Sequence, residues 1–162
     1  MNPFGQLAGN LESQLENYNK LIDLELIKVE ALYQNDIEKL KAITDQEEEL
    51  LKILTYLERE RIALVSAMGF RGMTMSQILP RIRPSDEKQR LDNTFNQLSN
   101  ALRKLKETNG ISRNLTEIRI RDTELAIKAF TPPPKPVVYN QDGTIQKNEN
   151  DKTKHTFKNE RI

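Results

Sequence analysis

Residues that could perform catalysis or bind metal are few in this 162-residue chain. It has no cysteine, which excludes a disulfide framework, a thiolate zinc site and a cysteine nucleophile. Its one histidine, His155, lies in a polar C-terminal segment, and it cannot activate a serine or threonine of the main body. The six glycines are scattered, so no glycine-rich phosphate loop is present. We therefore predict no enzyme activity, no metal site and no cofactor.

Two charged segments could suggest cation binding or nucleic-acid binding, but each lacks the other residues that such a site needs. The acidic run Gln46–Glu49 has no ligand-loop spacing, and we interpret it as the solvated side of a helix. Arginines are frequent between residues 59 and 90, but a nucleic-acid surface would sustain that density along one helix or interleave it with aromatic side chains. We expect no nucleic-acid partner. The alternative, an RNA- or DNA-associated helical protein, predicts binding that falls steeply with salt.

The net charge of +1 conceals an uneven distribution along the chain. Residues 1–60 carry 6 basic and 13 acidic side chains, whereas residues 61–130 carry 13 basic and 7 acidic ones. Two halves that fold against each other would use this asymmetry for orientation and solubility. A nucleic-acid surface in the basic half is the other interpretation.

No segment has the composition of a membrane anchor. The longest unbroken apolar run is Ile62–Val65, whereas a spanning helix needs about 20 residues. The first thirty residues carry five acids and two lysines and lack the apolar block of a secretory signal. We expect a soluble, cytoplasmic protein with no direct membrane insertion.

Helical periodicity predicts two long helices in the acidic half. Apolar residues recur at three- and four-residue steps over about 7–34 and again over about 36–68, which places them on one face of each helix. Glu25 is the one polar interruption of the first stripe. Asn35 and Asp36 are good capping residues between the helices, and Gly69 suits the left-handed end of the second. The short break predicts antiparallel neighbours.

The basic half begins with a loop and continues as a third long helix. Within 69–84, Thr74 and Gln77 fit a capping box that opens one helical turn, and the prolines forbid a longer helix. We interpret the methionines around this turn as a plug for the end of a bundle. Ser85 then starts a helix to about residue 130, whose apolar stripe falters at Thr108–Gly110.

Together these elements predict an all-α fold. It is an elongated antiparallel helical bundle or coiled coil of three long helices, with a short helix at the second turn. The bundle would occupy residues 1–130. Residues 131–162 would form a proline-rich spacer and a disordered tail, because this polar segment buries too little apolar surface to offset its ordering entropy.

The helix lengths point to a protein-binding surface. A second helix of about 33 residues spans roughly 50 Å and a third of about 44 residues roughly 66 Å, so the third outruns its partners near residue 118. An uncovered apolar helix end marks an interaction site. The uncovered apolar residues would be Ile120, Leu125, Ile127 and Phe130. The alternative is that Gly110 breaks the helix and residues 111–130 fold back as a fourth helix.

One apolar patch interrupts the tail. Val137–Gly143 combines a short β-prone run with the turn-forming pair Asp142-Gly143. We interpret this patch as a docking peptide, with an inert tail as the alternative.

In the order of its features the chain resembles the FlgN-type flagellar export chaperones. The matching segments are LESQLENYNKLIDLELIKVEALYQNDIEKLKAIT, EEELLKILTYLERERIALVSAMGF, MTMSQIL and LSNALRKLKETNGISRNLTEI. Asn109 and Asn114 fall in the Asn-containing stretch of the family. The tail segment VVYNQDGTI is similar to a tyrosine-plus-glycine segment of the family. Gly110 inside the third helix departs from the pattern.

The resemblance implies a non-enzymatic chaperone of flagellar type III secretion in the cytoplasm. Such chaperones hold the hook-associated proteins FlgK and FlgL by their C-terminal helical ends, prevent premature assembly and deliver them to the membrane export gate. Carried over to this chain, Tyr139, with Gly143, becomes the candidate for docking to the export gate. The resemblance also makes Leu115, Ile118, Leu125 and Ile127 candidates for client contact, and the helix-length argument adds Ile120 and Phe130. The alternative from another class is a structural coiled-coil homodimer or adaptor without an export role.

Overall fold

The computed structural model describes residues 2–134 of the chain. These residues contain helices and no strand, which confirms the all-α class for this part of the chain. In chain order the elements are α1 (Pro3–Gln34), α2 (Ile37–Ala67), α3 (Met75–Ile78), the 3-10 helix η1 (Leu79–Arg81) and α4 (Asp86–Phe130). The predicted disordered tail lies outside the described residues, except for 131–134.

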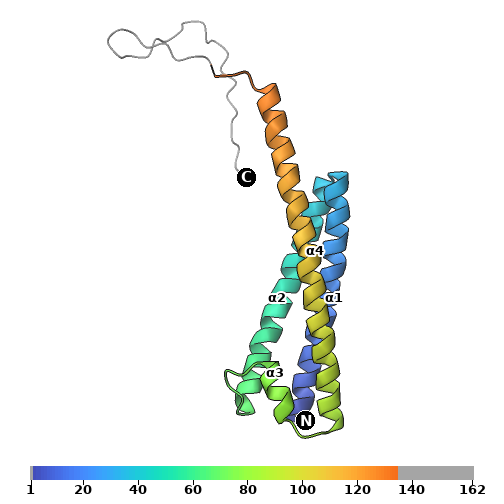
Figure 1. The fold of residues 1–162 in the computed structure, drawn as a ribbon, viewed down its shortest axis with the longest axis vertical. Coiled ribbons are helices and arrows are strands. Elements are labelled where there is room, and N and C mark those ends of the chain that lie inside the picture. Colours follow the sequence, from blue (N-terminus) through green and yellow to red (C-terminus); the bar gives the residue numbers. More distant parts are fainter. Residues whose placement is uncertain (1, 135–162) are drawn as a thin grey trace, which may run out of the picture. The chain divides into compact units, whose positions relative to one another are not determined.

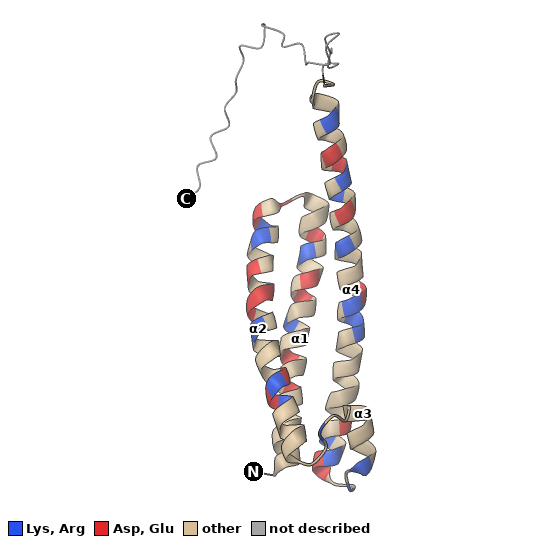
Figure 2. Ribbon diagram, turned by 90° about the vertical axis from the view of Figure 1, so that its left-hand side faces the viewer, with Lys and Arg blue, Asp and Glu red and all other residues tan. Residues whose placement is uncertain are grey.

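The chain divides into two units, one ending at Glu124 and one beginning at Leu125. In the first unit α1 and α2 are antiparallel neighbours, and α4 runs beside α1 (Figures 1 and 2). The short α3 and η1 lie at the end of this unit that also holds the N-terminus (Figure 1). Of the second unit, the last turns of α4 and residues 131–134 are described.

The break between α1 and α2 is made by the two predicted capping residues. Asn35 takes a left-handed conformation (φ 55°) and closes α1. The backbone N–H of Asp36 donates to the carbonyl of Ala31 at 3.0 Å, and its side chain accepts from the backbone N–H of Lys39 at 3.0 Å. Short polar side chains are favoured at these positions because they form hydrogen bonds with backbone groups that a helix end leaves unpaired.

The predicted start of the first helix near residue 7 is too late. α1 begins at Pro3, because Asn2 accepts a hydrogen bond from the backbone N–H of Phe4 at 3.1 Å and Pro3 suits the first helical position. Periodicity did not indicate this start because the apolar stripe begins only at Leu7. The capping signal of Asn2-Pro3 was nevertheless present in the sequence.

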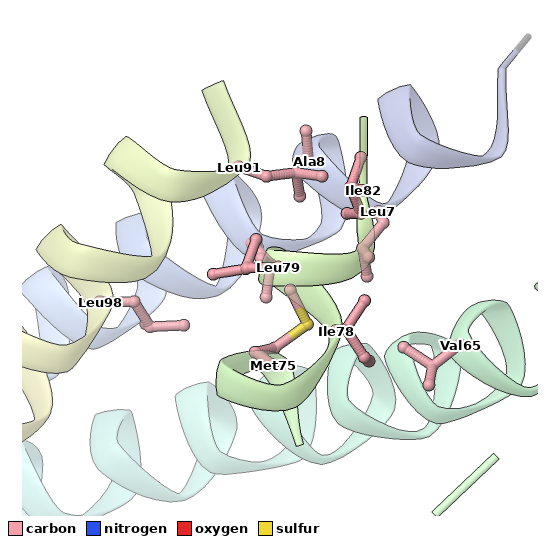
Figure 3. Close-up of a cluster of buried hydrophobic side chains, with 10 residues drawn as sticks. Leu7, Ala8, Val65, Met75, Ile78, Leu79, Ile82, Leu91 and Leu98 are labelled. Carbon is pink, nitrogen blue, oxygen red and sulfur yellow. The ribbon is translucent and has the colours of Figure 1, made fainter. Parts of the chain in front are cut away.

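The hydrophobic core is concentrated where α3 and η1 meet the long helices (Figure 3). Gly69 (φ 85°) ends the α2 segment as predicted, and the backbone N–H of Thr74 donates to Gln77 Oε1 at 2.9 Å to open α3. Met75 is buried in the cluster, and Met68 and Met73 pack against it, so the methionines do fill this end of the first unit. This cluster comprises Leu7, Ala8, Leu11, Val65, Met75, Ile78, Leu79, Ile82, Leu91 and Leu98.

α4 is one helix through Gly110, so the alternative of a fold-back at this glycine is wrong. Ser85 Oγ accepts from the backbone N–H of Lys88 at 3.1 Å at its start, as the cap prediction requires. A glycine within a helix costs about 1 kcal/mol relative to alanine. Hydrogen bonds from Asn109 and Ser112 to Glu25 of α1 hold the helix on both sides of Gly110 and offset this cost.

The core cluster predicts an unequal effect of two isoleucine truncations. Ile78 is fully buried (0% exposed), so Ile78→Ala should lower the free energy of unfolding by about 2–5 kcal/mol, the cost of a core cavity. Ile62 is 52% exposed, and Ile62→Ala should change it by no more than about 0.5 kcal/mol. Urea unfolding followed by circular dichroism measures both. Equal effects would contradict the assignment of the core.

Candidate functional site

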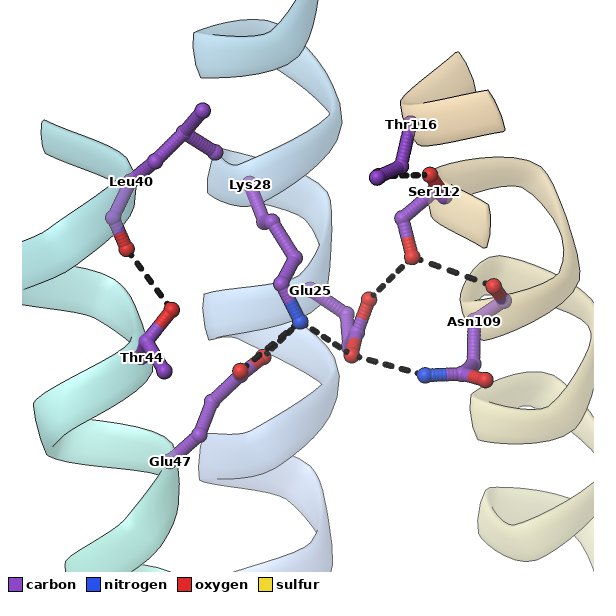
Figure 4. Close-up of polar contacts among 8 residues, drawn as sticks. All are labelled: Glu25, Lys28, Leu40, Thr44, Glu47, Asn109, Ser112 and Thr116. Carbon is purple, nitrogen blue, oxygen red and sulfur yellow. Dashed lines mark hydrogen bonds and ion pairs between the residues drawn. The ribbon is translucent and has the colours of Figure 1, made fainter. Parts of the chain in front are cut away.

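A buried carboxylate positions α4 against α1 (Figure 4). Glu25 of α1 is buried, and its Oε1 accepts from Asn109 Nδ2 of α4 at 3.0 Å. Its Oε2 accepts from the hydroxyl of Ser112 at 2.8 Å. An unpaired buried carboxylate would be strongly destabilising, so α4 is held in the one register that presents both donors to Glu25.

The same carboxylate is linked to α2 through a lysine. Lys28 Nζ lies 3.0 Å from Glu25 Oε1 and 2.7 Å from Glu47 Oε2 on α2. Two carboxylates therefore share one ammonium group, and all three long helices meet in a single polar network (Figure 4). None of the buried side-chain nitrogen or oxygen atoms in the described part of the chain lacks a hydrogen-bond partner.

The environment of the network shifts the pKa values of its three ionisable groups. Burial disfavours the charge of Glu25, but hydrogen bonds from Lys28, Ser112 and Asn109 outweigh it and hold the pKa of Glu25 below the ordinary 4.5. Burial raises the pKa of Glu47, and the nearby charge of Glu25 adds to this in opposition to Lys28. Burial alone would lower the pKa of Lys28, but the two carboxylates raise it. Glu47 is thus the less well compensated carboxylate.

The sequence contained a signal for this network, but the helical periodicity of the apolar residues does not by itself show which helices make the contact. Glu25 interrupts the apolar stripe of α1, and the stripe of α4 falters from Thr108 to Gly110. The structure brings these two interruptions together, because Asn109 and Ser112 face Glu25. A polar residue in each of two apolar stripes can indicate a buried polar contact between two helices.

A second contact holds α4 at the end of α1. Arg119 donates from Nε to the carbonyl of Leu32 at 3.1 Å and from Nη2 to the carbonyl of Tyr33 at 2.8 Å. These carbonyls belong to the last turn of α1, where a cation is favoured by the helix dipole. α4 is therefore fixed to α1 as far as Arg119, and each residue from 120 to 130 is exposed.

Three of the predicted contact residues lie in the first unit. Leu115 is half-buried, whereas Ile118 and Ile120 are exposed. Ile118 and Ile120 are two residues apart, so they point to different sides of α4. They flank Arg119, whose guanidinium is engaged with α1. The structure thus leaves two of these three side chains accessible to a partner.

The other three predicted contacts lie on α4 in the second unit. Leu125 is 59% exposed, Ile127 is 60% exposed and Phe130 is 89% exposed. Burial of large apolar side chains is favourable, so these three side chains form an apolar surface that the described part of the chain leaves uncovered. Tyr139 and Gly143, the predicted docking residues of the tail, lie outside the described residues.

Within residues 2–134, no helix combines the length and the apolar character needed to cross a lipid bilayer. The same residues hold no group of three His, Cys, Asp or Glu side chains arranged to bind a metal ion.

Comparison with known proteins decides the family. The family model described as FlgN protein matches residues 1–147. The chain belongs to the FlgN family. No curated protein and no solved structure gives a significant match. The FlgN match extends from α1 through α4 and into the segment beyond residue 134, so it includes both Glu25 and the exposed end of α4.

Membership of the FlgN family implies a role in flagellar export as a chaperone. The family is one of chaperones and not of enzymes. α4 of this FlgN protein presents exposed apolar side chains between Ile118 and Phe130.

The network predicts how stability depends on pH. Because the pKa of Glu25 is lowered in the folded state, its contribution is present above pH 4.5 and is lost as the pH falls through its folded value. The raised pKa of Glu47 acts in the opposite sense, since protonation of that group favours the folded state. Glu25→Gln should therefore remove part of the acid-induced loss of stability, measured as the free energy of unfolding from pH 7 to pH 3. An unchanged pH profile would show that Glu25 is not ionised in the network.

Proposed function

We propose that this FlgN-family protein is a cytoplasmic chaperone for hook-associated proteins of the FlgK and FlgL type. It binds the C-terminal helical region of the client, prevents premature assembly and delivers the client to the export gate. The main observation that supports this proposal is the exposure of Leu125, Ile127 and Phe130 on a continuous helix. Residues 1–130 act as the chaperone domain in this proposal, and residues 131–162 act as the spacer and docking tail.

The spacing of the exposed residues supports a helical client. Ile118 and Leu125 are seven residues apart, as are Ile120 and Ile127. Seven residues correspond to about two helical turns, so each pair is spaced to contact one side of an amphipathic helix. The two pairs are offset by two residues, so they lie on different sides of α4. Substitutions at Leu125 and at Ile127 therefore test different sides of the helix.

The client-binding proposal is tested by two single substitutions on α4. Leu125→Asp and Ile127→Asp each place a charge where an apolar contact is proposed, so at least one should weaken binding of a hook-associated protein by about tenfold or more. Binding is measured by isothermal titration calorimetry with the full-length chain, after co-purification identifies the client.

The control for this experiment is Ile37→Asp on α2, which replaces an isoleucine of similar exposure outside the proposed surface. It should retain the affinity of the wild type. Intact binding by both α4 variants would overturn the proposed contact surface. A stable homodimer without affinity for any hook-associated protein, seen by light scattering, would favour a structural coiled-coil protein instead.

The tail makes a separate contribution that can be tested independently. In the proposal Tyr139 docks to the export gate, and Gly143 provides the turn that follows it. Tyr139→Ala should weaken binding to the gate component while client affinity stays unchanged, because the two contacts use different segments. Phe157→Ala, a second aromatic truncation in the tail, is the matched control. Normal gate binding by the Tyr139→Ala protein would remove this residue from the mechanism.

A further inference from the structure

A groove between α1 and α2 forms a second candidate surface. Its lining belongs to these two helices and comprises Lys20, Asp23, Leu24, Asp45, Gln46, Glu49 and Leu50. Leu24 and Leu50 are half-buried, whereas the charged residues are exposed. The groove therefore has an apolar floor between acidic edges. It contains none of the α4 residues proposed to bind the client.

The apolar floor continues along both helices. Ile27 lies three residues after Leu24, and Ile53 lies three residues after Leu50, so each falls on the same side of its helix as the leucine. Both isoleucines are exposed. With the leucines they give a four-residue apolar strip, with two residues on each wall that lie just under one helical turn apart. A strip of this kind fits the apolar side of a helix laid into the groove.

The edges of the groove carry negative charge that the protein does not neutralise. Asp23 and Asp45 form no ion pair with any residue of the described range 2–134. Glu49 is paired with Lys52 at 2.8 Å, and Lys20 is paired with Glu16 at 2.7 Å. The cations near the groove are therefore already engaged, and the two aspartates remain available to a partner.

The distribution of charge between the two halves of the chain also favours a basic partner. Acidic residues, red in Figure 2, recur along α1 and α2. Of the ion pairs among residues 2–134, two join the acidic half of the sequence to the basic half: Arg90 pairs with Glu12, and Arg61 pairs with Glu58 within α2. Folding thus leaves most of the acidic excess of α1 and α2 on the surface. An acidic surface attracts basic partners and repels nucleic acid.

We propose that the α1–α2 groove binds an amphipathic helix of a basic partner protein. Leucine-type side chains of that helix would contact Leu24 and Leu50, and flanking lysines or arginines would face Asp23, Asp45 and Glu49. The proposal goes beyond client binding and does not rest on it, because the groove and the exposed end of α4 share no residue.

The test uses two synthetic helical peptides of about five turns, with the same leucine face and with either lysines or glutamates on its flanks. Binding to the full-length protein is measured by fluorescence anisotropy. The lysine peptide should bind and the glutamate peptide should not. The triple variant Asp23→Asn, Asp45→Asn, Glu49→Gln should bind the lysine peptide at least about tenfold more weakly, and wild-type binding should weaken as salt is added.

The matched control is the triple variant Glu107→Gln, Glu117→Gln, Asp122→Asn, which removes the same charge from exposed positions on α4. It should bind the lysine peptide as the wild type does. Equal weakening in both triple variants would overturn the proposal, since it would indicate attraction to net charge alone. The proposal would also be wrong if the lysine peptide failed to bind the wild type, if the glutamate peptide bound equally well, or if the groove variant bound normally.

Two further measurements separate this groove from other interactions. If light scattering showed a wild-type dimer that the groove substitutions convert to a monomer, the occupant would be a second copy of the chain and the proposal would fail. The affinity of the groove variant for a hook-associated protein should equal that of the wild type. Loss of client affinity in this variant would overturn the assignment of the groove to a separate partner and would leave the α4 variants to test client binding.

Discussion

The burial of one carboxylate, Glu25, constrains how the three long helices of this protein meet. A buried charge is tolerated only when hydrogen bonds and an opposite charge compensate it. Asn109 and Ser112 of α4 provide the hydrogen bonds, and Lys28 provides the charge while it also binds Glu47 of α2. Sliding α4 by one turn would remove both of its donors from Glu25. An apolar seam alone would permit such a slip more readily, and this network specifies the register.

The register has consequences for both ends of α4. Hydrogen bonds at Asn109 and Ser112 hold the helix on either side of Gly110, which is why the glycine does not end it. The same register brings Arg119 to the last carbonyls of α1. Beyond that contact the apolar side chains of α4 are exposed. A polar contact inside the first unit thus accounts for where the proposed client surface begins.

Most of the secondary structure could be predicted because its signals are local. Asn35-Asp36, Gly69, Thr74 with Gln77, and Ser85 each act on backbone groups within a few residues, and each lies at an observed helix end. The partners of Glu25 could not be predicted, because they depend on which helix faces meet. The continuity of α4 at Gly110 was undecided for the same reason. The contact residues remain a proposal, since exposure shows that a surface is available and does not identify its occupant.

The central claim is that the exposed apolar side chains near the end of α4 contact the client, while the polar network around Glu25 stays intact. Hydrogen exchange of the full-length protein, measured with and without a bound hook-associated protein, tests this claim most directly. The account predicts that the backbone amides of residues 118–130 gain protection when the client binds, because the client covers this part of α4, while the amides around Glu25 keep the protection they have in the free protein. Protection gained elsewhere, with no change in residues 118–130, would contradict it.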